Sequence, residues 1–207
     1  MSAIALLDYA AVLVFALTGA LVASRAQLDL VGFAFFACLT AVGSGTLRDV
    51  MLDRNPVFWI GDPTNIVIAV AAALLVFFTA HLVESRYRWL LWLDSFALAV
   101  AVPAGVGVSL LMAQPPLVII LMGMVTGCMG GLMRDVVMGE VPLVLKQGEL
   151  YVSAAFAGAA LAAGLDHIDV DQTTVLVACG VLTWALRAGS LVWGWSLPVY
   201  KSLPPRA

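Results

Sequence analysis

The chain has 207 residues, of which 63% are hydrophobic and only 11% are charged, and its formal net charge is −3. Soluble domains are about 45–50% apolar and about 25% charged, so this chain has too few polar residues to cover a water-soluble globule. The composition excludes soluble enzymes, nucleic-acid-binding proteins and disordered linkers. It indicates an integral membrane protein made of several helices.

Hydropathy divides the chain into seven apolar runs, each close to the roughly 20 residues that a helix needs to cross a bilayer. The predicted spans cover residues 5–23, 30–52, 63–82, 90–112, 116–138, 148–165 and 173–193. Charged residues or turn formers separate these runs, as expected at the ends of spans. We therefore predict one all-α membrane domain over residues 1–207, without room for a soluble domain, so that any activity lies within the membrane.

The distribution of positive charge predicts the orientation of the chain. With seven spans, one side of the membrane carries most of the basic residues, namely Arg25, Arg86, Arg88, Lys146, Lys201 and Arg206. The other side carries Arg54 and an acidic loop at 166–171. Because loops rich in Lys and Arg stay in the cytoplasm, we expect the N-terminus outside the cell and the C-terminus inside.

The sequence repeats itself at an offset of 86 residues. The matching pairs are Leu7-Asp8 and Leu93-Asp94, Gly19 and Gly105, Thr40 and Thr126, Arg48-Asp49 and Arg134-Asp135, and Pro56 and Pro142. Each repeat holds three spans, an odd number, so the second copy must cross the membrane in the opposite direction. We predict a 3+3 inverted repeat, over 7–82 and 93–166, followed by a seventh helix at 173–193. Inverted repeats commonly place a pathway at their interface, which favours transport over catalysis.

The second and fifth spans carry the candidate site residues, which are Thr40, Gly43, Ser44, Gly45, Arg48 and Asp49, and Thr126, Gly127, Gly130, Gly131, Arg134 and Asp135. Glycines near mid-span predict kinks in both helices, which would expose backbone oxygens to a cation. The alternative for the glycines is close packing between helices. Ionisable groups inside a span are costly unless they are paired or hydrated, so the Arg-Asp pairs either lock the helix ends or line a pathway.

Five other ionisable residues have predicted roles. We expect Asp8 and Asp94 to cap their helices or to pair with the arginine of their repeat, in preference to the alternative of binding an ion directly. Arg187 either reaches an acid on another span or extends towards the headgroups. Lys146 and Glu149 are expected to form a charge pair at the membrane interface. The His and Cys residues lack metal-ligand spacing and no nucleophile–base arrangement emerges, so we predict neither a metal, a cofactor nor an enzyme.

These residues give the chain a family resemblance. It resembles the prokaryotic members of the TRIC (trimeric intracellular cation) channel family, which overlap a bacterial family whose duplicated domain is named for glycine transport. The matching motifs are Gly45-Thr46-Leu47-Arg48-Asp49 with Pro56, Gly130-Gly131-Leu132-Met133-Arg134-Asp135 with Pro142, and Arg187 with Leu197-Pro198. The Lys-Glu-Val signature of animal members is absent, so counter-ion function in calcium stores and inositol-lipid binding are not implied.

The resemblance implies a homotrimer in the prokaryotic inner membrane, surrounded by lipid, with one hourglass pore in each protomer. The pore would pass potassium and some sodium between the two repeats, along the second and fifth spans and their candidate residues. Because Gly43-Ser44-Gly45 stands where the second repeat has Gly130-Gly131, the two constrictions need not be equivalent.

Two other functions remain open at this point. A secondary transporter of a small zwitterion such as glycine could hold the carboxylate with an arginine and the amine with an aspartate. A purely structural role is the third possibility.

Overall fold

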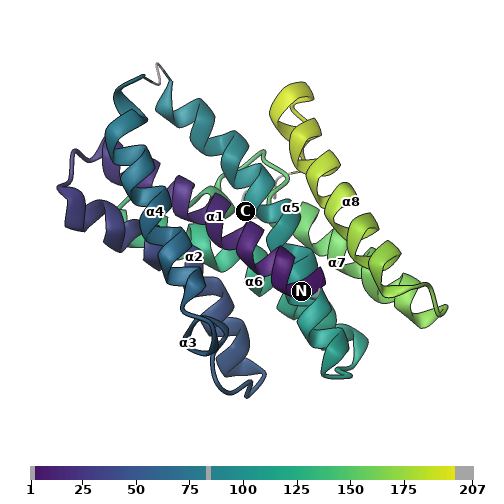
Figure 1. The fold of residues 1–207 in the computed structure, drawn as a ribbon. Coiled ribbons are helices and arrows are strands. Elements are labelled where there is room, and N and C mark those ends of the chain that lie inside the picture. The colour runs from purple at the N-terminus through teal and green to yellow at the C-terminus, as the bar shows by residue number, and fades with distance from the viewer. Residues whose placement is uncertain (1–2, 83–84, 199–207) are drawn as a thin grey trace, which may run out of the picture.

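The structure, a computed structural model, describes residues 3–82 and 85–198, and over this range it contains helices and no strands (Figure 1). Two groups of three long helices follow one another, and an eighth helix ends the fold. The long helices are α1 (Ala3–Arg25), α2 (Leu30–Met51), α4 (Thr64–Thr79), α5 (Arg86–Leu111), α6 (Pro116–Met138), α7 (Val152–His167) and α8 (Gln172–Trp193). The short ones are α3 (Phe58–Gly61) and the 3-10 turns η1 (Ala80–Leu82) and η2 (Leu143–Leu145).

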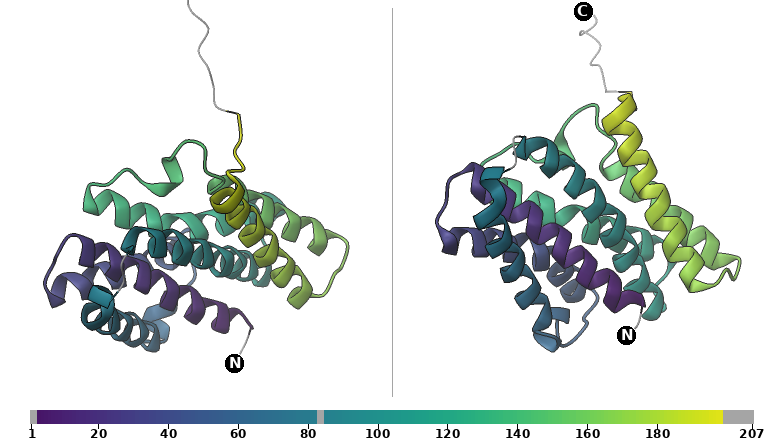
Figure 2. Two further views of the ribbon diagram at one scale, coloured as in Figure 1. Left: turned by 90° about the horizontal axis from the view of Figure 1, so that it is seen from above. Right: turned by 45° about the horizontal axis from the view of Figure 1, so that its top comes forward.

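The first helices of the two groups, α1 and α5, pack against each other at the centre of the fold (Figure 2). Ile4, at the start of α1, contacts Gly107 near the end of α5. At the other end of α1, the Arg25 guanidinium lies 5.3 Å from the ring centre of Tyr87, at the start of α5. The two helices therefore run in opposite directions, and the predicted inverted arrangement of three and three helices is confirmed.

Close contacts inside each group depend on one glycine. A Cβ atom on Gly19 of α1 would lie 2.3 Å from the carbonyl oxygen of Phe36 in α2. A Cβ atom on Gly105 of α5 would lie 2.5 Å from the carbonyl oxygen of Met122 in α6. Only glycine allows the backbones to approach so closely, which explains why this residue occurs in both repeats.

The predicted number of seven spans is not confirmed. Among the described helices, six are long and apolar enough to cross a membrane, with η1 extending α4 to Leu82. The remaining long helix, α7, has 16 residues, fewer than the roughly 20 that a bilayer requires. It begins at Val152 instead of the predicted residue 148.

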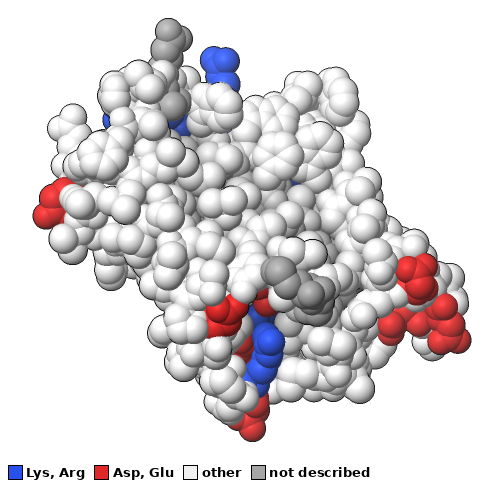
Figure 3. Space-filling view, viewed as in Figure 1, with Lys and Arg blue, Asp and Glu red and all other residues white. Residues whose placement is uncertain are grey.

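Charged side chains gather at two opposite ends of the surface in Figure 3, and the wide area between them is nearly free of charge. Arg25 and Lys146, predicted to share one side of the membrane, both lie over the ring of Tyr87. Lys201 and Arg206 lie outside the described residues. The chain thus has the charge distribution of a membrane protein, and its orientation stays a prediction.

Candidate functional site

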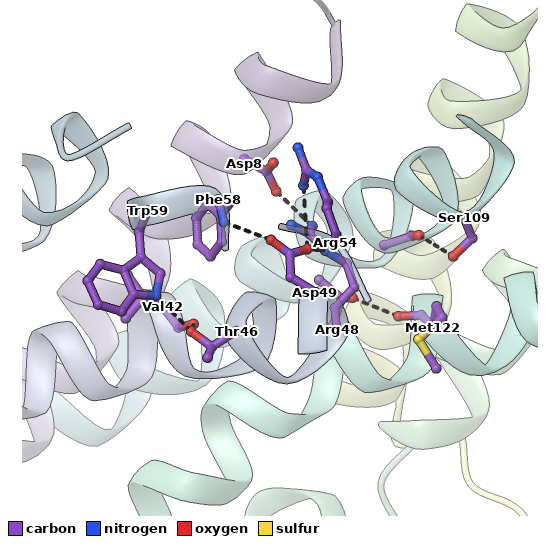
Figure 4. A network of polar contacts seen from close by, with 12 residues as sticks. Asp8, Val42, Thr46, Arg48, Asp49, Arg54, Phe58, Trp59, Ser109 and Met122 are labelled. Carbon is purple, nitrogen blue, oxygen red and sulfur yellow. Dashed lines mark hydrogen bonds and ion pairs between the residues drawn. The ribbon is translucent and has the colours of Figure 1, made fainter. Parts of the chain in front are cut away.

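Arg48, near the end of α2, is the centre of a buried ionic cluster in the first repeat (Figure 4). Its Nε donates to Oδ1 of Asp49 at 2.7 Å, and its Nη1 donates to Oδ1 of Asp8 in α1 at 2.9 Å. Oδ2 of Asp49 accepts a hydrogen bond from the backbone N–H of Phe58 at 2.8 Å, where α3 begins. Two carboxylates therefore neutralise one guanidinium whose side chain has 0% exposure.

The second repeat builds the same cluster around Arg134 of α6. Nε of Arg134 donates to Oδ1 of Asp135 at 2.8 Å, and its Nη1 donates to Oδ1 of Asp94 in α5 at 3.0 Å. Oδ2 of Asp135 accepts from the backbone N–H of Leu143 at 2.9 Å, where η2 begins. The two clusters thus contain the same residue types and the same hydrogen bonds, from corresponding helices.

These contacts decide between the alternatives for Asp8 and Asp94. Both residues pair with the arginine of their own repeat, which confirms that alternative. The capping alternative is wrong, because α1 begins at Ala3 and α5 at Arg86, so both carboxylates lie inside their helices. The ion pairs fix the ends of α2 and α6 to the first helix of each repeat.

The two threonines of the candidate site lie in helix–helix contacts. The Thr40 hydroxyl donates to the carbonyl oxygen of Phe36 at 2.7 Å, and the Thr126 hydroxyl donates to that of Met122 at 2.7 Å. Each hydroxyl packs against the glycine of the neighbouring helix, Gly19 or Gly105. The structure therefore gives both threonines a packing role, and their predicted place along an ion pathway stays a prediction.

Helices α2 and α6 run without interruption through their glycines, so the predicted kinks are not confirmed. Several glycines lie at tight contacts, where an added Cβ would come within 3 Å of another residue. These are Gly43 against Met133, Gly45 against Phe58, Gly127 against Val102, and Gly130 against the carbonyl oxygen of Thr40. Ser44 is buried, and Gly131 lies beside the second cluster. The packing alternative thus has direct support at these glycines.

A polar cavity of about 170 Å³ adjoins the first cluster. Its lining includes Asp8, Tyr9, Arg54, Phe58, Asp62 and Asn65. Nη1 of Arg54 lies 3.4 Å from Oδ1 of Asp49, which brings a second guanidinium to the cluster. The hydrogen bond that Tyr9 donates, together with those from Thr64, holds the pKa of Asp62 below its ordinary value of 3.8. The first cluster thus adjoins a cavity lined by polar side chains, and the Asp8 side chain is partly exposed there.

A third buried arginine was not predicted to belong to a site. Arg187 of α8 has a side chain with 0% exposure, and its Nη1 lies 2.7 Å from Oε2 of Glu149. This contact confirms the alternative in which Arg187 reaches an acid on another element. The predicted charge pair between Lys146 and Glu149 is wrong, because Lys146 instead donates to the Tyr87 hydroxyl at 2.6 Å. The intramembrane position of Arg187 was the available sequence signal, but its partner depends on the packing of α8.

The sequence matches one known protein family over both repeats. The family described as "Glycine transporter" matches residues 5–81 and again residues 91–167. The inner membrane protein YadS of Escherichia coli K12 is 34% identical over 94% of both chains. A UPF0126 membrane protein of Vibrio cholerae is 36% identical and covers 94% of this chain and 82% of its own.

A solved structure decides the family. The TRIC trimeric intracellular cation channel orthologue from Rhodobacter sphaeroides is 39% identical, with a TM-score of 0.90 over 94% of this chain and 100% of its own. The chain belongs to the prokaryotic TRIC family. Its relation to the glycine transporter family is also shown, because that family matches three quarters of the chain in two copies. A prokaryotic TRIC channel solved in 0.5 M KCl shares the fold at 20% identity, with a TM-score of 0.86.

Proposed function

We propose that this protein is a monovalent cation channel, passing potassium and some sodium, with one pathway in each protomer of a homotrimer. The pathway would run between the repeats 7–82 and 93–166, along α2 and α6, with the N-terminus outside the inner membrane and the C-terminus in the cytoplasm. The predicted residues from Thr40 to Asp49 and from Thr126 to Asp135 belong to this proposal. The similarity to the TRIC trimeric intracellular cation channel orthologue from Rhodobacter sphaeroides supports it.

The main support for this proposal is the pair of corresponding ionic clusters, one in each repeat. An unpaired arginine at each mouth would repel cations. The second cluster sets one guanidinium against two carboxylates. The first cluster with its cavity sets Arg48 and Arg54 against Asp8, Asp49 and Asp62. Each end therefore has a formal excess of one negative charge, which favours a cation over an anion.

The alternative, a secondary transporter of a small zwitterion such as glycine, is favoured by the name of the matching family. It requires an arginine that can receive a carboxylate. In both clusters Nε and Nη1 of the arginine already donate to aspartates, and the side chain has 0% exposure. A zwitterion would have to displace those carboxylates, so the geometry favours the channel.

Planar-bilayer recording of purified protein under asymmetric KCl tests the proposal. A channel gives discrete current steps and a reversal potential near that of potassium. Saturable glycine counterflow without unitary currents would establish the transporter instead, and protein that moves no solute would indicate a structural role.

One pair of variants tests the role of the first mouth. Asp8→Asn removes a negative charge from the polar cavity, so we expect a several-fold lower conductance at low KCl. The loss should shrink at high KCl, because salt screens the charge. Asp171→Asn, at the exposed N-cap of α8, is the matched control and should leave the currents unchanged.

A further inference from the structure

The repeats differ at one buried position, which lies at the start of their third helices or directly before it. In the first repeat this residue is Asn65 of α4, which lines the polar cavity beside Asp8. In the second repeat it is Tyr151, directly before α7, 86 residues further along. The buried small residues that follow keep the same offset: Ala69, Ala72 and Ala73 in α4, and Ala155, Gly158 and Ala159 in α7. Asn65 and Tyr151 therefore occupy corresponding positions.

The side chain of Tyr151 reaches the second ionic cluster. A Cβ atom placed on Gly131 would lie 3.3 Å from the Tyr151 hydroxyl and 3.4 Å from a carboxylate oxygen of Asp94. Nη2 of Arg134 would lie 3.6 Å from the same point. Tyr151 is only 2% exposed. Its ring thus fills the position that corresponds to a lining residue of the open cavity in the first repeat.

Helix α8, which has no counterpart within the repeats, holds this segment in place. The Arg187 guanidinium lies 5.0 Å from the ring centre of Tyr151, within the range of a cation–π contact. The ion pair with Glu149 fixes Arg187. The hydroxyl of Ser190 accepts a hydrogen bond from the backbone N–H of Leu150 at 2.9 Å. Three consecutive residues before α7 are therefore attached to α8.

Polar atoms around the Tyr151 hydroxyl are not fully satisfied by hydrogen bonds. Among the described residues, the Tyr151 hydroxyl has no hydrogen-bond partner, nor do Nη2 of Arg134 and Oδ2 of Asp94. Such buried polar atoms favour contact with water. The preceding segment contains Gly148, which has a φ of 84°, and a Cβ atom placed on it would meet no described atom within 4 Å. The space vacated by the ring would thus be lined by polar atoms.

We infer that the ring of Tyr151, held beneath Arg187 by α8, closes the second-repeat end of the cation pathway, which conducts when the ring leaves this position. The inference rests on the proposed channel function. Tyr151 is then the residue that determines whether this mouth is open, and Arg187 and Glu149 are positioning residues.

Exchange of the corresponding residues tests the inference. In planar bilayers under asymmetric KCl, Tyr151→Asn is expected to raise the open probability about tenfold, a shift in the closed–open equilibrium. The reversal potential should not change, because the ionic clusters remain. The reciprocal variant Asn65→Tyr should lower the current by narrowing the first mouth. Tyr87→Asn, which removes a tyrosine 39% exposed at the surface, is the control for loss of a tyrosine.

The outcomes separate this inference from the proposed function. Wild-type currents that Tyr151→Asn leaves unaltered would overturn the closing role and leave the channel standing. Folded wild type and folded Tyr151→Asn that both lack currents would overturn both. If Tyr151→Asn does not fold, Glu149→Gln provides the second test, because it weakens the attachment of Arg187 and should also raise the open probability. An unchanged open probability in a folded Glu149→Gln protein would contradict the inference.

Discussion

The two ionic clusters share their residue types and hydrogen bonds but differ in their access to water. The Asp8 side chain is 12% exposed and lines a polar cavity, whereas that of Asp94 has 0% exposure. Arg54 reaches the first cluster, but its counterpart in the second repeat, Glu140, pairs with Arg25 at 3.1 Å instead. The duplicated residues determine the ion pairs, while the residues that were not duplicated determine whether water reaches them.

Loss of the central arginine should show the largest difference between the repeats. Arg134→Met leaves two carboxylates buried without their partner, and breaking such a pair costs about 3–5 kcal/mol. Arg48→Met should cost less, because Asp8 is in contact with the cavity and Arg54 remains beside Asp49. Thermal unfolding in detergent measures both losses. Equal destabilisation would show that the difference in exposure has no energetic consequence.

The glycine contacts should respond equally in both repeats. Gly19→Ala and Gly105→Ala each bring a methyl group onto a backbone carbonyl oxygen, and such overpacking costs about 1–3 kcal/mol. Gly164→Ala is the control, because its methyl group meets no described atom within 4 Å. That control should be neutral or stabilise slightly by reducing the freedom of the unfolded chain. Unfolding midpoints that differ strongly between Gly19→Ala and Gly105→Ala would contradict the structural equivalence of α1 and α5.

A smaller effect is expected from the attachment of the segment before α7 to α8, which has no counterpart in the first repeat. Ser190→Ala removes the acceptor for the backbone N–H of Leu150, and loss of such a hydrogen bond costs about 0.5–1.5 kcal/mol. Thr79→Ala, in the first repeat, removes an exposed hydroxyl that donates to a carbonyl of its own helix, and should change stability less. Native-state hydrogen exchange of the residues before α7 should increase in Ser190→Ala alone. Unchanged hydrogen exchange of these residues would show that α8 does not hold this segment in place.

The smallest expected effect is a loss of stability at acid pH that comes from the first repeat alone. Asp62 can be protonated, whereas the residue at the corresponding position of the second repeat, 86 residues later, is Gly148. The folded protein lowers the pKa of Asp62, mainly through the hydrogen bond from Tyr9. Ionised Asp62 therefore stabilises the fold above its ordinary pKa of 3.8, and this contribution is lost as the pH falls below that value. Tyr9→Phe should reduce the fall in unfolding temperature between neutral and acid pH. An identical fall in wild type and variant would contradict this assignment.

Local sequence signals were sufficient for the helices whose ends are determined locally. The predicted span at 116–138 is α6, because Pro115-Pro116 favours a helix start and Gly139, with a φ of 73°, ends it. The start of α7 depends on a distant residue instead. Glu149 and Leu150 are held by Arg187 and Ser190, so the helix begins later than the apolar run does.

In the candidate site, too, the sequence indicates some contacts, while others depend on how distant helices pack. The repeat in the sequence placed Arg48 and Arg134 at corresponding positions within predicted spans, where pairing was one of two alternatives because an unpaired charge there is costly. Neither composition nor spacing could select Glu149 for Arg187, since that choice depends on how α8 packs. The short helix α3 was likewise not predicted, because its first N–H is bound by Asp49, nine residues earlier.

The two aspartates that follow the arginines also have a mechanical consequence. Asp49 binds Arg48 with one oxygen and the N–H of Phe58 with the other, and Asp135 does the same for Arg134 and Leu143. Each chain reversal is thereby tied to the end of its own helix, so we expect the two to move together. On the proposed channel function, we expect the movements that admit an ion to arise elsewhere, by rotation of one three-helix unit against the other or at hinges that lack such a tie.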